Sequence, residues 1–244
     1  MRVILTHNQA DFDALASLLG AHKLYPDAVP VLPARLNRNV REFVSLYQNG
    51  LPMRHIDDIA FKAVDEVILV DTQRLPEIKG LRRSVPLRII DHHPPLKRYP
   101  ADSPHQIQQC GATVTLIVEE MQARGLTLET LEATLLALGV YEDTGALTYG
   151  TTTPRDTRAA AWLQEQKAVL DTVRRFLTPP LSPEQLAIYD YLLTHSETRT
   201  INGYPMTIGF VTLDRTVNEI NGVAHRLRDT LDPTALFVVA AFPD

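Results

Sequence analysis

The sequence predicts an α/β protein: a parallel β-sheet flanked by helices, followed by a partial second α/β domain. One observation is that short apolar runs alternate with segments whose apolar residues recur at helical spacing, as in sheets with crossover helices. The other is that the runs at 66–70 and 87–90 lack regular polar alternation. Parallel strands that are covered on both faces have this character.

The expected elements follow one another closely through the first part of the chain. Strands are expected over residues 2–6, 29–32, 66–70 and 87–90, and helices over 13–24, 40–47, 112–124 and 130–141. Thr153-Pro154-Arg155-Asp156 is typical of a helix start, because threonine caps, proline fits the first turn and aspartate suits the N-terminus. A further helix is expected from Ser182 to His195.

A polar stretch at 194–203 ends in Asn202-Gly203, which is a turn signal, and it predicts a domain boundary. We therefore expect a first domain over 1–197 and a second over 203–244. The second contains a strand at 206–213, a helix at 216–228 and a strand at 235–242, which form one βαβ unit. A single unit is a poor domain by itself, so we expect the chain to be part of a longer multidomain protein.

Composition narrows the class of partner. With a net charge of −5, the 244-residue chain does not favour coating long nucleic acid, although a short phosphate-bearing substrate remains compatible. Cys110 is the single cysteine, which excludes an internal disulfide and favours a cytoplasmic location. Apolar runs stay below the roughly 20 residues that a membrane helix needs, so no membrane association is expected.

Four groups of acidic and imidazole side chains lie where an expected strand or helix ends. They are His7-x-x-x-Asp11-x-Asp13 after the first strand, Asp71 after 66–70, Asp91-His92-His93 after 87–90, and Asp143 at the end of 130–141. The carboxyl ends of parallel strands meet in one crevice, where ligands bind. We therefore expect these side chains to converge.

Three of these groups also have simpler interpretations. Asp13 suits the N-cap of the helix that follows it, and Asp71 suits a turn. Asp143-Thr144-Gly145 suits a helix C-terminus, although an aspartate there is unfavourable to the helix dipole. Asp-His-His at a strand end is less often incidental, because adjacent histidines point to different sides and can bind a metal and a substrate oxygen.

A compact group of four aspartates and two histidines would repel itself without cations. Two divalent metals about 3.5–4 Å apart would neutralise it. Mixed carboxylate and imidazole ligands suit Mn²⁺, with Fe²⁺, Co²⁺ or Mg²⁺ as alternatives. Such a pair would bridge a water molecule, lower its pKa toward neutral and hold a phosphoryl group for in-line attack.

In this order, the motifs resemble those of the DHH phosphoesterase superfamily. It includes family II inorganic pyrophosphatases, single-strand exonucleases, phosphodiesterases of nano-RNA and cyclic dinucleotides, and exopolyphosphatases. The resemblance covers about residues 1–193. Segments 6–17, 24–26 and 39–43 resemble the DHH module found upstream of paired CBS domains and a poly(A)-polymerase/CCA-adding nucleotidyltransferase domain, and 206–242 resembles the start of a DHHA1 domain.

The resemblance implies that His7 and Asp11 bind one metal, that Asp13 and His92 bind the other, and that Asp71 and Asp143 touch both. It also implies that His93 faces the substrate phosphate as a catalytic residue, with Asp91 orienting the neighbouring histidines. The glycine-rich loop with which DHHA1 domains grip substrate does not occur in this sequence, and neither do the basic motifs of pyrophosphatases.

Three further residues are candidates for binding substrate. Arg35 and Arg38 can hold phosphates or form a solvated face. The backbone N–H groups from Gly111 onward can meet a phosphate, or the segment can simply open a close-packed helix.

We expect a Mn²⁺-dependent phosphoesterase that uses a metal-bridged hydroxide to hydrolyse phosphodiester or phosphoanhydride bonds, in short oligonucleotides or nucleotides. One alternative is a nucleotide-binding regulatory module of a larger tRNA nucleotidyltransferase or poly(A)-polymerase-type protein. The other is an inorganic pyrophosphatase or exopolyphosphatase. The sequence leaves open whether the protein forms a homodimer.

Overall fold

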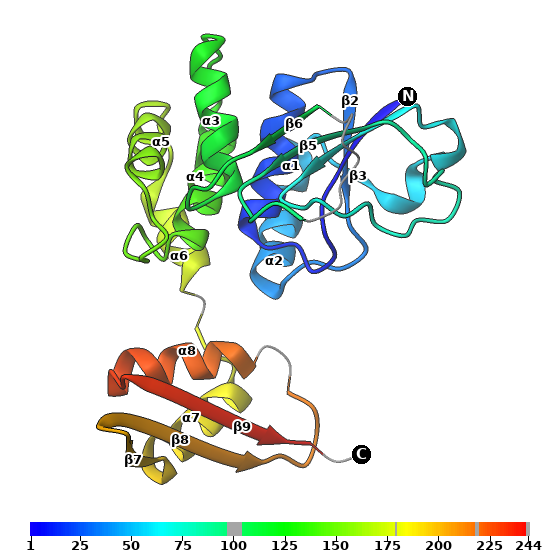
Figure 1. Cartoon of the computed structure of the whole chain (residues 1–244). Helices are drawn as coiled ribbons and strands as arrows, with labels where there is room; N and C mark the ends of the chain where they lie inside the picture. The colour runs from blue at the N-terminus through cyan, green and yellow to red at the C-terminus, as the bar shows by residue number, and fades with distance from the viewer. Residues whose placement is uncertain (97–103, 179, 218–219, 243–244) are drawn as a thin grey trace. The chain divides into compact units, whose positions relative to one another are not determined.

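The computed structural model describes residues 1–96, 104–178, 180–217 and 220–242. Contacts between residues divide the chain into two compact units, Met1–Thr178 and Pro179–Asp244 (Figure 1). Within the described residues, every helix is too short or too polar to cross a lipid bilayer.

The first unit is built on a parallel sheet, as the sequence predicted. Its described strands are β1 (Arg2–Leu5), β2 (Ala28–Leu32), β3 (Arg54–His55), β4 (Glu66–Val70), β5 (Leu87–Asp91) and β6 (His105–Ile107). All of them pair in parallel, in the order β3-β2-β1-β4-β5-β6. The chain runs from β1 outward to β3 and returns to β4 on the other side of β1. The strand order therefore reverses between β1 and β4, the position at which such sheets bind ligands.

Helices follow the strands in the order that the sequence predicted. They are α1 (Phe12–Leu24), α2 (Arg38–Tyr47), α3 (Thr113–Ala123), α4 (Thr130–Asp143), α5 (Pro154–Glu165) and α6 (Leu170–Leu177), with short 3-10 turns at Gln48–Gly50, Ile56–Asp58 and Phe61–Ala63. Thr153 caps α5 in a capping box with Asp156, so the expected helix start is confirmed.

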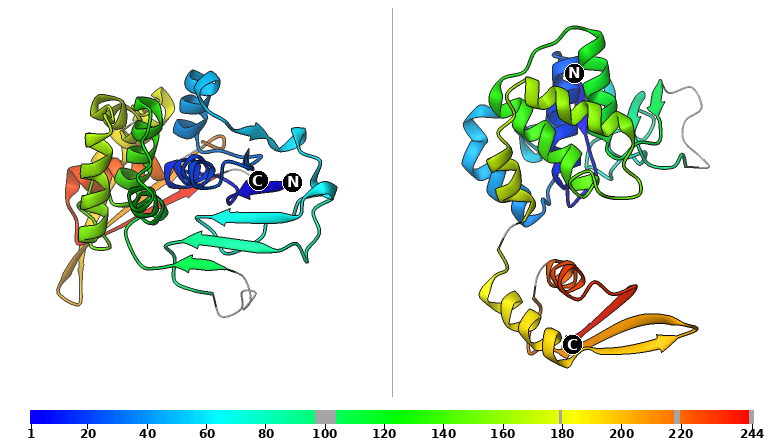
Figure 2. Two further views of the ribbon diagram at one scale, coloured as in Figure 1. Left: turned by 90° about the horizontal axis from the view of Figure 1, so that it is seen from above. Right: turned by 90° about the vertical axis from the view of Figure 1, so that its left-hand side faces the viewer.

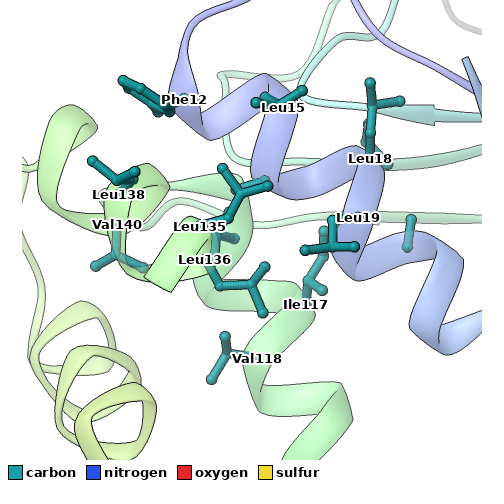
Figure 3. Packing of buried hydrophobic residues seen from close by; sticks show 14 of the residues in the cluster. Phe12, Leu15, Leu18, Leu19, Ile117, Val118, Leu135, Leu136, Leu138 and Val140 are labelled. Carbon is teal, nitrogen blue, oxygen red and sulfur yellow. The ribbon is translucent and has the colours of Figure 1, made fainter. Parts of the chain in front are cut away.

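The sheet is buried on both faces. One face contributes Ile4, Ile68, Val70 and Ile90 to the core formed with α1, α3 and α4. In that core, the side chains of Leu15 and Leu19 on α1 are directed toward Leu135 on α4 and Ile117 on α3 (Figure 3). The alternate strand residues Val3, Leu5, Val67, Leu69 and Ile89 pack with Phe61, Val64 and Val85 on the other face. Burial on both faces explains the apolar strand sequences.

The second unit contains α7 (Pro183–His195), β7 (Glu197–Ile201), β8 (Tyr204–Thr212), α8 (Ile220–Leu231) and β9 (Ala235–Ala241) (Figure 2). Strands β7 and β8 form an antiparallel hairpin, while β8 and β9 are parallel. The hairpin turns at Asn202 and Gly203, whose φ angles are 52° and 85°. Two positive φ angles are what a tight hairpin turn needs.

The boundary between the units differs in position from the sequence-based expectation at 194–203. Ile188 and Leu192 of α7 pack with Val211, Val223 and Leu227, so α7 belongs to the second unit. The polar stretch comprises the last two residues of α7, then Ser196, strand β7 and its turn. The five residues of β7 are exposed in a regular strand, and exposure gives a strand the polar composition of a linker.

Candidate metal centre and active site

The candidate site lies where the strand order reverses. His7 follows β1, and Asp71 follows β4, so the two residues stand on either side of the switch point. Asp91 ends β5 and leads into His92 and His93. The first turn of α1 and the last turn of α4 complete the site with Asp11, Asp13 and Asp143.

The structure brings all six expected ligands together. The candidate ligand atoms of His7, Asp11 and Asp71 lie within 4.8 Å of one another, and so do those of Asp13, His92 and Asp143. His7 Nε2 lies 3.2 Å from Asp71 Oδ2. His92 Nε2 lies 3.3 Å from Asp143 Oδ2, 3.6 Å from Asp71 Oδ1 and 4.0 Å from Asp13 Oδ2. Side chains up to 136 residues apart in sequence therefore converge on one site.

His92 is oriented as a metal ligand would be. Its Nδ1 donates a hydrogen bond to the Cys110 carbonyl at 3.0 Å, which leaves Nε2 directed at the carboxylates. That Nε2 is buried and makes no hydrogen bond in the described structure. Burial lowers the pKa of His92, but Asp143, the Cys110 carbonyl and Asp71 raise it to about 9. An imidazole nitrogen that makes no hydrogen bond and faces carboxylates is a fitting ligand for a divalent cation.

Asp71 is buried and has an unusual backbone conformation. Its φ is 56°, in the left-handed region, where aspartate is tolerated better than most residues. The side chain is buried, and its Oδ1 accepts a hydrogen bond from Thr113 Oγ1 at 2.9 Å. Backbone conformations of this kind cost about 1–3 kcal/mol and cluster at functional sites.

The carboxylates crowd one another in the absence of cations. Burial and the charge of Asp71 raise the pKa of Asp11 to about 6. Burial, Asp71 and Asp143 hold the pKa of Asp13 well above its usual value. Bound cations would relieve this repulsion and restore the charged carboxylates. The donor set of oxygen and imidazole nitrogen therefore fits the metal pair expected from the sequence.

The N-cap of α1 is Asp11, whose Oδ1 accepts the Ala14 N–H at 3.0 Å. The alternative interpretation as an N-cap therefore applies to Asp11 and not to Asp13. Asp13 lies two residues further on, in the first turn of α1, and reaches across to α3, where its oxygens accept the backbone N–H groups of Thr113 and Val114 at 2.7 and 3.0 Å. Asp13 thereby joins the starts of two helices.

His93 is held by a separate hydrogen-bond chain. Its Nδ1 donates to Asp91 Oδ1 at 2.9 Å, and the Gln73 amide donates to Asp91 Oδ2 at 2.6 Å. Burial raises the pKa of Asp91, but these two hydrogen bonds outweigh burial and hold it below its usual value. His93 is 54% exposed and accessible to a substrate. Asp91 thus orients His93, whereas the Cys110 carbonyl orients His92.

Glu142 lies beside Asp11 and Asp143 of the same site, although the sequence did not single it out. Its Oε2 accepts the Phe12 N–H at 2.5 Å, and its Oε1 accepts the Asn39 side-chain N–H at 3.4 Å. Burial and the charge of Asp11 raise the pKa of Glu142 to about 8. A signal was present in the sequence, since Glu142 and Asp143 are two acids at a helix C-terminus, where the dipole disfavours them.

The candidate substrate-binding residues differ in their availability. Arg35 is exposed, and its carbonyl accepts the N–H groups of Gln9 and Ala10, so it lies beside the loop that carries His7 and Asp11. Arg38 begins α2 and is also exposed.

Gly111 corrects an expectation. Its N–H is buried and donates to both oxygens of Asp156, at 3.0 and 2.9 Å. This N–H is therefore committed to the protein interior and is not available to a substrate phosphate. Gly111 begins a close-packed helix start, which was the alternative interpretation.

Residues 2–140 match the DHH family, N-terminal domain, and the chain belongs to that family. It is also similar to the A-adding tRNA nucleotidyltransferases of Geobacter sulfurreducens and Aquifex aeolicus, with 36% identity to each over 98% of this chain. The chain spans 28% of the length of these two relatives.

Two solved structures share the fold. A candidate family II inorganic pyrophosphatase from Methanococcus jannaschii has a TM-score of 0.60 and 22% identity, covering 95% of this chain and 78% of that one. An exopolyphosphatase-related protein from Bacteroides fragilis has a TM-score of 0.66 and 18% identity, covering 95% of this chain and 68% of that one. At these identities the likeness shows the α/β fold alone.

Proposed function

We propose that the first unit is a two-metal phosphoesterase that hydrolyses phosphodiester or phosphoanhydride bonds, with short oligonucleotides or nucleotides as substrates. The observation that carries this proposal is the buried Nε2 of His92, which makes no hydrogen bond and faces the carboxylates of Asp13, Asp71 and Asp143. Membership of the DHH family supports it.

We assign one cation to His7, Asp11 and Asp71, and the other to Asp13, His92 and Asp143, because these are the groups whose ligand atoms lie within 4.8 Å of one another. Asp71 also forms a group with His92 and His93, so its carboxylate could contribute to both cation sites. Oxygen and imidazole donors favour Mn²⁺, with Mg²⁺, Co²⁺ or Fe²⁺ as alternatives.

When bound, two divalent cations supply an activated water and stabilise charge on a phosphoryl group. His93 supplies the complementary proton chemistry. Its hydrogen bond to Asp91 raises the pKa of His93, which favours the charged imidazolium. In that form Nε2–H donates a hydrogen bond to a phosphoryl oxygen or a proton to the leaving oxygen. The Gln73 amide holds Asp91 in place for this role.

A nucleotide-binding role within a longer protein is the second candidate. It is supported by the 36% identity to A-adding tRNA nucleotidyltransferases, of which this chain spans 28%. In this proposal the second unit is a partial DHHA1-like domain, and the site binds a nucleotide without turnover. Arg35 and Arg38 are the residues that we propose for phosphate binding in either case.

The experiment that separates these candidates is an assay of the protein with Mn²⁺ against dinucleotides, oligoribonucleotides, cyclic dinucleotides, polyphosphate and pyrophosphate. We expect hydrolysis of a short nucleotide substrate and its loss in Asp71→Asn, since asparagine keeps the backbone conformation but loses the charge. Asp57→Asn, on an exposed side chain, is the matched control. A metal-loaded protein that hydrolyses none of these substrates would contradict the enzyme, and nucleotide binding without turnover would establish the second candidate.

A further inference from the structure

We propose that Thr113 is a positioning residue of the metal centre. It orients the expected metal ligands without being a ligand itself. The inference rests on the proposed metal-dependent function. Thr113 is the first residue of α3 and is fully buried. It is bonded to three of the expected ligands, namely Asp13, Asp71 and His92.

Each of these bonds uses a different capacity of Thr113. Its backbone N–H donates to Asp13 Oδ2 at 2.7 Å. Its hydroxyl donates to Asp71 Oδ1 at 2.9 Å and accepts the His92 backbone N–H at 3.3 Å. One side chain thereby links the segments that follow β4 and β5 to the start of α3.

The direction of the hydroxyl proton is determined by its neighbours. A hydroxyl has one proton, and the His92 N–H is itself a donor, so the proton of Thr113 goes to Asp71. This bond fixes which oxygen of Asp71 faces which part of the centre. Oδ1 lies 3.6 Å from His92 Nε2, while Oδ2 lies 3.2 Å from His7 Nε2. The two oxygens of Asp71 are therefore directed toward different histidines, so that each oxygen could bind a cation beside its own histidine.

The same helix provides a matched control. Thr115 is also fully buried, and its hydroxyl also donates to a buried carboxylate, Asp156 Oδ1, at 2.6 Å. Asp156 is not an expected metal ligand, and it binds the helix start through Gly111 and Thr153 instead. Thr113 and Thr115 thus lie in the same helix, are equally buried and have the same side chain. They differ in the carboxylate to which the hydroxyl donates, which is an expected metal ligand only for Thr113.

The test compares Thr113→Val, Thr113→Ser and Thr115→Val in the full chain, measuring Mn²⁺ binding by calorimetry at one pH and the thermal midpoint without metal. Valine matches threonine in shape but lacks the hydroxyl. We expect Thr113→Val to weaken Mn²⁺ binding by about 10- to 100-fold, the usual effect of losing a partner that orients a ligand. Thr113→Ser should restore binding close to the wild-type value. Thr115→Val should lower the thermal midpoint and leave Mn²⁺ affinity unchanged.

Wild-type Mn²⁺ affinity in Thr113→Val would overturn the inference while leaving the proposed function intact. An equal loss of affinity in Thr115→Val would also overturn it, because the effect would then belong to helix stability. If Thr113→Val does not fold, Thr113→Ser and Thr113→Ala provide the same comparison, since they differ by the hydroxyl alone. Absence of Mn²⁺ binding by the wild-type protein would instead reject the proposed function, and this inference with it.

Discussion

At the scale of single residues, four titratable side chains of the site have raised pKa values in the metal-free protein. The pKa values of His7 and His92 are raised to about 9, that of Glu142 to about 8 and that of Asp11 to about 6. For His7 the Asp71 carboxylate is the main cause, and for Asp11 and Glu142 the main cause is burial. In each case the folded metal-free state retains protons that the unfolded chain would release at a lower pH.

Metal binding must displace these protons, and this predicts how affinity depends on pH. We expect Mn²⁺ affinity to rise steadily between pH 6 and pH 9, because His7 and His92 bind metal only in their neutral forms. Calorimetry in buffers of different ionisation enthalpy would measure both the affinity and the protons released. An affinity independent of pH over this range would show that the two histidines are not ligands.

The same raised pKa values predict the stability of the metal-free protein. A group whose pKa is higher in the folded state loses its stabilising contribution as pH rises from the unfolded to the folded value. For Glu142 that window runs from its ordinary value of 4.5 to about 8. With a chelator present, the wild-type thermal midpoint should therefore fall across this window. Glu142→Gln should lessen the fall by a few degrees, and a midpoint profile identical to wild type would contradict this expectation.

At the scale of elements, the close approach of α4 to α1 places Asp13 beside the other ligands. A Cβ added to Gly139 on α4 would lie 2.8 Å from Val114 Cγ2, 3.0 Å from Ala16 Cβ and 3.2 Å from Asp13 Cα. These contacts come from two neighbouring helices, and one is to backbone. A side chain at this position would therefore push α1 away from α4, together with the ligands in its first turn.

A pair of glycine substitutions tests this packing. Alanine is favoured over glycine in a helix by up to about 1 kcal/mol, so both Gly139→Ala and Gly222→Ala gain propensity. A Cβ added to Gly222 would lie 3.8 Å from Leu181 Cδ2, which is an ordinary contact distance, and we expect the thermal midpoint to rise. At Gly139 we expect a lower midpoint and weaker Mn²⁺ binding. Stabilisation by Gly139→Ala would contradict the close packing of α1 on α4.

Most elements could be predicted from the sequence because burial imposes a pattern on them. The strand Glu66–Val70 was predicted with its exact bounds, since all but its first residue is buried. Strands β3 and β7 were missed because their residues are exposed, and β6 is short and only partly buried. Helix α6 was missed because it has eight residues, of which Val173 and Phe176 are buried.

The sequence also predicted which expected ligands would meet, but not what holds them. The expected ligands lie at the ends of strands and helices, and those ends can be predicted from the pattern of apolar residues along the sequence. Thr113, Gln73 and Glu142 act through contacts across the fold, such as the Gln73 amide on Asp91 eighteen residues away. Pairings of this kind depend on tertiary structure and leave no periodic signal in the sequence.

At the scale of the whole molecule, each unit has a core of its own. The expected ligands all lie in the first unit, whereas Val211, Val223 and Leu227 belong to the core of the second. Metal binding should therefore stabilise the first unit directly. A ligand at 1,000 times its dissociation constant stabilises the state that binds it by about 4 kcal/mol.

Calorimetric unfolding with and without Mn²⁺ tests this division. We expect Mn²⁺ to raise the transition that belongs to the first unit. Leu227→Ala, which creates a cavity costing about 2–5 kcal/mol, should lower the transition of the second unit and so identify it. If Mn²⁺ shifted only the transition that Leu227→Ala lowers, the cations would bind outside the first unit.

We propose that six side chains hold two cations at the point where the strand order reverses. Anomalous diffraction at the manganese edge, from crystals of the protein grown with Mn²⁺, tests this directly. Two peaks about 3.5–4 Å apart are predicted, one beside His7 and Asp11 and the other beside Asp13 and His92, with Asp71 contacting both. A map without anomalous peaks in this pocket, or with peaks only elsewhere on the molecule, would contradict it.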